Sequence, residues 1–168
     1  MTISWDEVDQ ISMNNQKHGR SLVQGRARGK VLHTDVPLSF WMGIDPQTGV
    51  VIDKHHPLSG VSVTGKILLL PGGRGSCSGS CGLVELIMSG YAPAALVLEA
   101  EDPILALGAL LAAEIFGRSI PVVSVDPQLS RRLASMPSLA IEDSYIAYGE
   151  DEAERIELKP VSSGMPAL

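Results

Sequence analysis

The residues best suited to chemistry in this 168-residue sequence form a segment rich in glycine and serine, PGGRGSCSGS, at residues 71–80. It follows an apolar run at residues 66–70, typical of a strand buried on both faces, and precedes an apolar stretch with helical character. Ligands of open α/β sheets bind where such strands end. Gly72, Gly73 and Gly75 allow positive φ and close backbone approach, and the first amides of a helix attract anions. The segment therefore predicts an anion-binding loop.

Two side chains of this loop are suited to act on a bound anion. Arg74 can clamp a carboxylate or a phosphate through two hydrogen bonds. Ser76 lies between the glycine turn and the helix start, where its hydroxyl can point outward. A purely structural alternative is that Ser76 or Ser78 caps the helix. No lysine follows Gly75 or Gly79 and no glycine stands two residues after Ser76, so neither a nucleotide P-loop nor a serine-hydrolase elbow is predicted.

The cysteines and histidines are competing candidates. Cys77 and Cys81, one helical turn apart, are the two cysteines of the chain, and we interpret them as residues that fill small packing sites. Two thiols supply neither a disulfide framework nor a structural zinc site, so a metal site would need further ligands besides these two. His33, His55 and His56 are rival acid/base groups, although a histidine pair before a proline is more often structural or on the surface.

An alternation of strands and helices must position the loop. After the strand at residues 66–70, the pattern predicts a helix that begins within residues 78–82 and ends at Gly90, a strand at residues 94–98, a helix from Asp102-Pro103 through Phe116, and a strand at residues 120–125. This order implies right-handed crossovers and a parallel sheet.

The flanking regions are less regular. We expect one or two strands at residues 21–36, a loop-rich region at residues 37–60 with a short strand at residues 50–52, and short strands at residues 140–148 and 155–158. Asp45, in an Ile-Asp-Pro sequence, is most simply a turn residue. We divide the chain into an N-terminal arm (residues 1–20), one domain (residues 21–160) and a C-terminal tail (residues 161–168).

Composition limits the classes of function. A chain that is 45% hydrophobic and 19% charged is long enough for one substantial core. A net charge of −6 and an aromatic content of 4% argue against a nucleic-acid partner. The polar N-terminus does not have the pattern of a secretory signal, and the longest apolar run, residues 104–113, is too short to span a bilayer. We expect a cytoplasmic protein without a membrane partner.

Four stretches together resemble the small subunit of aconitase X enzymes: residues 37–49, 53–60, 65–80 and 94–125, within a match over residues 25–127. The resemblance implies an α/β fold, the swivelling β/β/α domain equivalent to the mobile fourth domain of aconitase. It also implies a heterodimer with a large subunit that holds an iron-sulfur cluster, so this chain would bind no metal or cofactor alone. The substrate would be a small hydroxy acid.

The same resemblance implies roles for the loop residues. Ser76 matches the family serine that accepts the substrate proton, and Arg74, Gly75 and Cys77 would contact the substrate. Cluster cysteines belong to the large subunit of such enzymes, so neither Cys77 nor Cys81 is expected to bind iron. A free serine hydroxyl is too weak a base at neutral pH, so its alkoxide needs amides and a cation beside it.

Two dehydrations are known in this family. The bacterial enzymes convert cis-3-hydroxy-L-proline to Δ1-pyrroline-2-carboxylate. This chain resembles them in the loop sequence Gly-Gly-Arg-Gly-Ser-Cys-Ser, in the turn at residues 55–57 and in its N-terminal arm. The alternative is the archaeal reaction, which converts mevalonate 5-phosphate to trans-anhydromevalonate 5-phosphate. A third hypothesis is a non-catalytic swivelling module whose glycine loop binds an anion.

Overall fold

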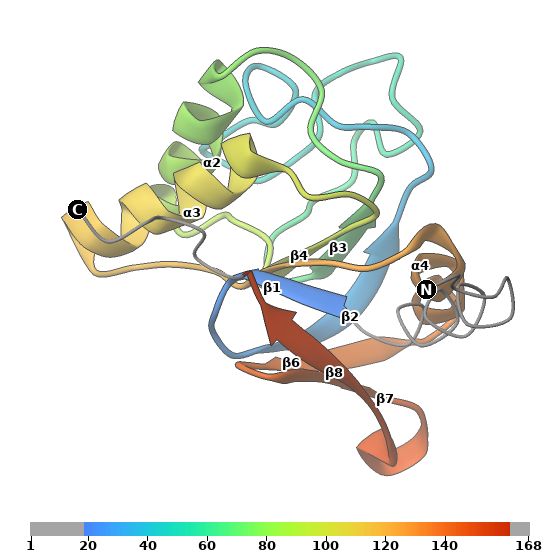
Figure 1. Cartoon of the computed structure of the whole chain (residues 1–168). Helices are drawn as coiled ribbons and strands as arrows, with labels where there is room; N and C mark the ends of the chain where they lie inside the picture. The colour runs from blue at the N-terminus through green and yellow to red at the C-terminus, as the bar shows by residue number, and fades with distance from the viewer. Residues whose placement is uncertain (1–18, 162–168) are drawn as a thin grey trace, which may run out of the picture.

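Eight strands form a closed barrel in the computed structural model, which describes residues 19–161 (Figure 1). Their order around the barrel is β1-β5-β4-β3-β2-β6-β7-β8. The strands are β1 Gly19–Val23, β2 Ala27–His33, β3 Ile67–Leu70, β4 Ala95–Leu98, β5 Val122–Ser124, β6 Ser138–Glu142, β7 Tyr145–Tyr148 and β8 Glu154–Pro160. The helices are α2 Ser78–Ser89, α3 Pro103–Phe116, α4 Pro127–Ala134 and the 3-10 helix η1 Glu150–Glu152.

The parallel part of the barrel confirms the predicted alternation of strands and helices. Strands β2, β3, β4 and β5 pair in parallel, and α2 and α3 lie side by side on their outer face (Figure 1). Helix α2 ends at Ser89 and is capped by Gly90, whose φ of 82° is the left-handed conformation expected of a glycine at that position. Helix α3 begins after Asp102 and ends at Phe116, as its Asp-Pro start predicted.

The apolar run in β3 serves two cores. Leu68 and Leu70 pack into the core beneath α2 and α3, whereas Ile67 and Leu69 pack into the barrel interior. All four side chains are fully buried because successive side chains of a strand point to opposite faces. This double burial is why the segment is apolar throughout, and it fixes where the loop after Leu70 starts.

The antiparallel part closes the barrel in a way that the sequence did not reveal. Strands β6, β7 and β8 form a meander, and β1 joins it to the parallel part by pairing antiparallel to β5 and parallel to β8. Gly19 and Arg20, which we had assigned to the arm, are the first residues of β1. Residues 1–18 of that arm and residues 162–168 of the tail lie outside the described residues.

Two local expectations were wrong. The strand expected at residues 50–52 is reduced to isolated bridges, Ile44 with Val51 and Val50 with Ser62, because the chain turns at Gly49 with a φ of 68°. Helix α4 was not expected, although it begins after Asp126 with the same Asp-Pro sequence that marks α3. In the part of the chain that the structure describes, no helix is both long and apolar enough to cross a membrane.

Candidate functional site

The glycine loop connects β3 to α2 and is held against the segment that follows β2. Leu38 forms a parallel bridge with Gly73, its amide donates to the Gly72 carbonyl at 3.4 Å, and its carbonyl accepts the Arg74 amide at 3.0 Å. Gly75 has a φ of 120°, which a residue with a side chain rarely adopts. The backbone of the loop is therefore fixed up to the residue before Ser76.

Ser76 is exposed, and its hydroxyl pairs with that of Ser78. Their Oγ atoms are 2.8 Å apart. The N-cap of α2 is Cys77, and no side chain caps this helix. The structural alternative, in which Ser76 or Ser78 caps α2, is therefore wrong. Ser80 bonds within its own turn, because its Oγ donates to the Cys77 carbonyl at 2.7 Å.

Two amides at the start of α2 remain available to an anion. The Gly79 amide donates to the Ser76 carbonyl at 3.1 Å, and the Ser80 amide donates to the Cys77 carbonyl at 3.2 Å. The amides of Cys77 and Ser78 have no hydrogen-bond partner among residues 19–161. Together with the positive end of the helix dipole, these two donors can stabilise negative charge next to Ser76.

Arg74 is paired with a carboxylate that the sequence did not reveal as part of the site. Its Nη2 lies 2.5 Å from Asp53 Oδ2, and Asp53 Oδ1 accepts the His55 amide at 3.0 Å. The His55 amide, followed by the Arg74 guanidinium, holds the pKa of Asp53 below its usual value. The pair orients the guanidinium, so an incoming anion would share Arg74 with Asp53.

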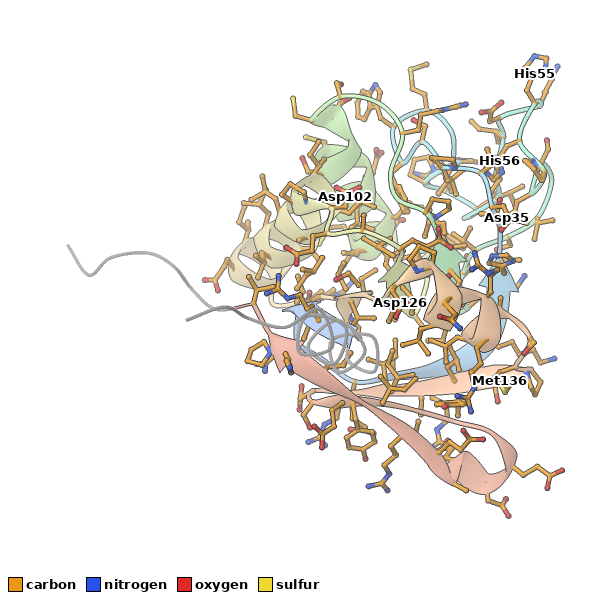
Figure 2. All side chains as sticks on the ribbon, turned by 45° about the vertical axis from the view of Figure 1, so that its right-hand side comes forward. Asp35, His55, His56, Asp102, Asp126 and Met136 are labelled. Carbon is orange, nitrogen blue, oxygen red and sulfur yellow. The ribbon has the colours of Figure 1, made fainter. Side chains whose placement is uncertain are left out.

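His56 is a structural histidine. Its side chain is buried, its Nδ1 accepts the Leu58 amide at 3.1 Å, and its Nε2 lies 3.1 Å from the Val36 carbonyl oxygen. Because Nδ1 accepts, Nε2 must carry the hydrogen and donate. His55 points outward at the edge of the molecule, whereas His56 lies further in (Figure 2). The interpretation of this pair as structural or on the surface fits both positions.

Asp102 holds the glycine loop from the other side. Its Oδ2 accepts the Gly73 amide at 2.9 Å, while its Oδ1 accepts the amides of Ile104 and Leu105 at 3.0 and 3.1 Å. The sequence indicated Asp102 as a helix start and nothing more. One carboxylate therefore both caps α3 and fixes the loop that carries Ser76.

A small pocket of about 20 Å³ lies among these groups. Phe40, Arg74, Gly75, Ser76 and Asp102 are among the residues that line it. Such a volume holds about one water molecule, so a substrate cannot be enclosed by this surface alone. The geometry is that of one half of a site, with an exposed hydroxyl, a cation and free amides.

The cysteines and Asp45 lie outside this pocket. Cys77 and Cys81 are both exposed free thiols, so their interpretation as packing residues was wrong: the start of α2 projects them away from the core. No group of three or more potential metal ligands occurs within residues 19–161. Asp45 is a turn residue, as expected, because its carboxylate accepts from the Gln47 amide at 2.9 Å and from the Thr48 hydroxyl at 2.8 Å.

Comparison with known proteins gives a consistent set of matches. The family model described as aconitase X swivel domain matches residues 16–148. A cis-3-hydroxy-L-proline dehydratase of Pseudomonas aeruginosa is 45% identical over 144 residues, which cover 86% of this chain and 25% of that protein. A phosphomevalonate dehydratase small subunit of Methanocella arvoryzae is 37% identical over 143 residues, 85% of this chain and 98% of that one.

A solved structure has the same fold. The crystal structure of Thermococcus kodakaraensis aconitase X in its holo-form superposes with a TM-score of 0.63 at 32% identity, over 84% of this chain and 97% of that chain. The chain thus spans a quarter of the length of the Pseudomonas aeruginosa hydroxyproline dehydratase, but nearly the whole of the small subunit and of the solved chain.

Proposed function

This chain belongs to the aconitase X swivel domain family, and we propose that it is the small subunit of a dehydratase that converts cis-3-hydroxy-L-proline to Δ1-pyrroline-2-carboxylate. Its partner in this proposal is a large aconitase-like subunit. The observation that carries the proposal is the position of Ser76, an exposed hydroxyl on a fixed glycine loop beside free helix amides and a cation.

Proton removal by Ser76 is the step that this chain would supply. The Ser76 alkoxide takes the proton from the substrate α-carbon, the electrons of that bond form a double bond to the neighbouring carbon, and hydroxide leaves. The resulting enamine tautomerises to the imine product. The amides of Cys77 and Ser78, the Ser78 hydroxyl and the Arg74 guanidinium would stabilise the alkoxide before it accepts the proton.

The remaining loop residues would orient the substrate. Arg74 would bind the substrate carboxylate, and Gly75 lets the substrate approach the backbone because it has no side chain. Cys77 is exposed beside Ser76, where its thiol can contact the substrate from the edge of the site. The Asp53 carboxylate keeps the Arg74 guanidinium from turning away.

An iron-sulfur cluster does not fit this chain alone. Clusters are usually held by four cysteine thiolates, whereas the chain has two cysteines, both exposed, one at the N-cap of α2 and the other in its first turn. We therefore assign the cluster of the proposed enzyme to the partner and derive no step through it. In this proposal the base belongs to this chain and the metal to its partner.

The choice of substrate rests on the relatives. The Pseudomonas aeruginosa hydroxyproline dehydratase is more similar than the Methanocella arvoryzae phosphomevalonate dehydratase subunit, at 45% against 37% identity over nearly equal lengths. The test is to assay the chain, assembled with its large partner, on both substrates. Turnover of cis-3-hydroxy-L-proline supports the proposal. Turnover of mevalonate 5-phosphate alone corrects the substrate, and turnover of neither rejects the enzyme in favour of a binding module.

A further inference from the structure

A second surface lies next to the proposed site and exposes large apolar side chains. The turn at residues 39–43, hereafter the Trp41 turn, leaves Trp41 47% exposed and Met42 79% exposed, and the neighbouring Ile52 is 51% exposed. A cluster of exposed apolar side chains is costly for a protein that stays alone in water, and such clusters mark interaction surfaces.

The backbone of the Trp41 turn is strained and tightly fixed. Met42 has a φ of 62°, an unfavourable conformation for a residue other than glycine, asparagine or aspartate. A Cβ atom on Gly82 of α2 would lie 2.0 Å from the Phe40 carbonyl oxygen, so the turn presses directly on that helix. The Ser39 hydroxyl donates to the Trp41 carbonyl at 2.7 Å. The molecule thus holds two large apolar side chains outward in one prearranged conformation.

A hollow of about 270 Å³ is lined by the Trp41 turn, by the residues that follow it and by α2. Its walls are mostly apolar, with Phe40, Trp41 and Ile52 among them, and two carboxylates, Asp45 and Glu85, also line it. An apolar side chain flanked by lysine or arginine fits such a hollow, because the carboxylates favour a cation beside it.

The Trp41 turn is joined to the proposed site through short contacts. Phe40 lines both the hollow and the pocket that contains Ser76. The carbonyl of Gly43 accepts the amide of Asp53 at 3.4 Å, and Asp53 is the carboxylate that orients Arg74. The hollow and the pocket that contains Ser76 are therefore neighbours, and Phe40 forms part of the wall of both.

We propose that the Trp41 turn and its hollow are the docking surface for the large, cluster-bearing partner subunit, which inserts an apolar side chain flanked by a basic residue. The proposal rests on the proposed function, because that function requires a second body to enclose a substrate against Ser76. A second copy of this chain is disfavoured as the occupant, since it would bring the same two carboxylates, and a net charge of −6, to the same place.

The competing surface is the outer face of α3. It exposes several apolar side chains, among them Leu107, Leu110, Ile115 and Phe116. The first turns of α3, after Asp102, lie against the glycine loop, whereas at about 1.5 Å per residue the far end of the helix lies on the order of 20 Å from its start. Contact with that face would leave the pocket open, and this face provides a matched control.

The experiment measures the affinity of the full-length chain for its purified large partner by calorimetry, without turnover. Trp41→Asp should raise the dissociation constant at least about 100-fold, as loss of a central aromatic anchor does. Leu110→Asp, at a residue 45% exposed on α3, should change it less than about threefold. Met42→Gly separates docking from folding: glycine relieves the positive φ, so the melting temperature should hold or rise while affinity falls.

The outcomes are distinct from those of the proposed function. Wild-type affinity in Trp41→Asp, an equal loss in Leu110→Asp, or no association of the wild-type chain each overturns the docking surface. An assembled wild-type complex that dehydrates neither substrate rejects the proposed function and leaves the docking surface in place. Dehydratase activity of the assembled Trp41→Asp chain at saturating concentration should recover at least in part, since Ser76 and Arg74 remain.

Discussion

Helices α3 and α4 begin with the same dipeptide, yet only one of the two starts is connected to the proposed site. Asp102 and Asp126 both cap their helices through Oδ1, which accepts two backbone amides at 2.9–3.1 Å in each case. Asp102 Oδ2 also accepts the Gly73 amide, whereas Asp126 Oδ2 is buried without a hydrogen-bond partner among residues 19–161. The two aspartates, labelled in Figure 2, therefore cap their helices alike but differ in what the second carboxylate oxygen contacts.

A local sequence signal and a functional position are therefore separate properties of a residue. An Asp-Pro pair after a parallel strand produces a capped helix in both places, because the carboxylate accepts the first free amides and proline suits the first turn. Whether the second carboxylate oxygen does more depends on what the fold places next to it. At α3 the neighbour is the loop with Ser76, and at α4 there is no such loop.

The largest expected effect tests whether the loop held by Asp102 carries the chemistry. In the assembled enzyme, Ser76→Ala should lower the rate of dehydration by about 10²- to 10⁴-fold, because it removes the proposed base. The decisive measurement is solvent deuterium exchange at the substrate α-carbon, which reports proton removal even when water loss is blocked. Exchange at the wild-type rate in Ser76→Ala would show that another group is the base.

Two serine variants serve as controls for that result. Ser130→Ala, on α4, removes a buried hydroxyl that has no hydrogen-bond partner in the described part of the chain, so activity and stability should be kept. Ser78→Ala should have an intermediate effect, because Ser78 Oγ lies 2.8 Å from the proposed base and contacts it. A loss in Ser130→Ala equal to that in Ser76→Ala would point to a folding defect.

The next effect concerns two arginine–carboxylate ion pairs, Arg74 with the half-buried Asp53 beside the glycine loop and Arg132 with the exposed Glu154 at α4. Arg74→Ala should cost about 2 to 4 kcal/mol of transition-state stabilisation, measured as a fall in kcat/KM, since it removes the charged donor that we propose binds the substrate. Arg132→Ala on α4 removes a similar pair, Arg132 with Glu154 at 2.5 Å, and should leave kcat/KM unchanged. Equal kinetics of the two variants would contradict the role of Arg74.

The two caps themselves can be compared directly. In Asp102→Asn, the amide nitrogen must face either the Gly73 amide or the two helix amides, so one set of bonds is lost in either orientation. We expect a loss of about 1 to 3 kcal/mol in stability and a fall of about 10- to 100-fold in kcat, because the loop shifts. Asp126→Asn keeps its cap and should change neither.

The changes in stability and in kcat can be measured separately. Chemical denaturation of the isolated chain reports the stability change, and steady-state kinetics of the assembled enzyme report kcat. An Asp102→Asn enzyme with wild-type kcat would show that the bond to Gly73 does not position the loop.

The smallest effect concerns the pH dependence of the Asp53 pair. The pKa of Asp53 is lower in the folded chain than its ordinary value of 3.8, so its ionised form stabilises the fold above that value. This contribution disappears as the pH falls through the lowered pKa, where the carboxylate is protonated. The melting temperature of the wild type should exceed that of Asp53→Asn at neutral pH and approach it in acid. A difference that is independent of pH would exclude the charge as its cause.

The sequence predicted the elements near the loop and missed most long-range contacts. The apolar run of β3, the glycine turn and the Asp102-Pro103 start are local signals, and each produced the expected structure. Helix α4 escaped prediction because its eight residues make only about two turns, although Leu129 and Leu133 share its buried face and its Asp126-Pro127 start is the same signal as that of α3. The closed barrel could not be predicted from the sequence either, because it depends on pairing between β1 and β8, at opposite ends of the described chain.

The same distinction applies to the site. Arg74 and Ser76 stand out by type and local spacing, whereas their supports do not. Asp53 precedes Arg74 by 21 residues, and Asp102 follows Gly73 by 29 residues. The sequence alone does not indicate that these carboxylates meet the loop. The exposure of Cys77 was missed for a related reason: residue type favours burial, while its place at the start of α2 decides against it.

The parallel pairing of β1 with β8 has a consequence for how the barrel can be attached to other polypeptide. Gly19 lies opposite Leu158 and Ser21 opposite Pro160, so the entry to the first strand and the exit from the last strand are two residues apart along the ladder. Because the two strands are parallel, polypeptide attached before the first strand and after the last would leave the barrel in opposite directions, and no strand would need to open to accommodate it. Fused to a longer chain at one of these ends, the barrel could turn as a rigid body about that single connection.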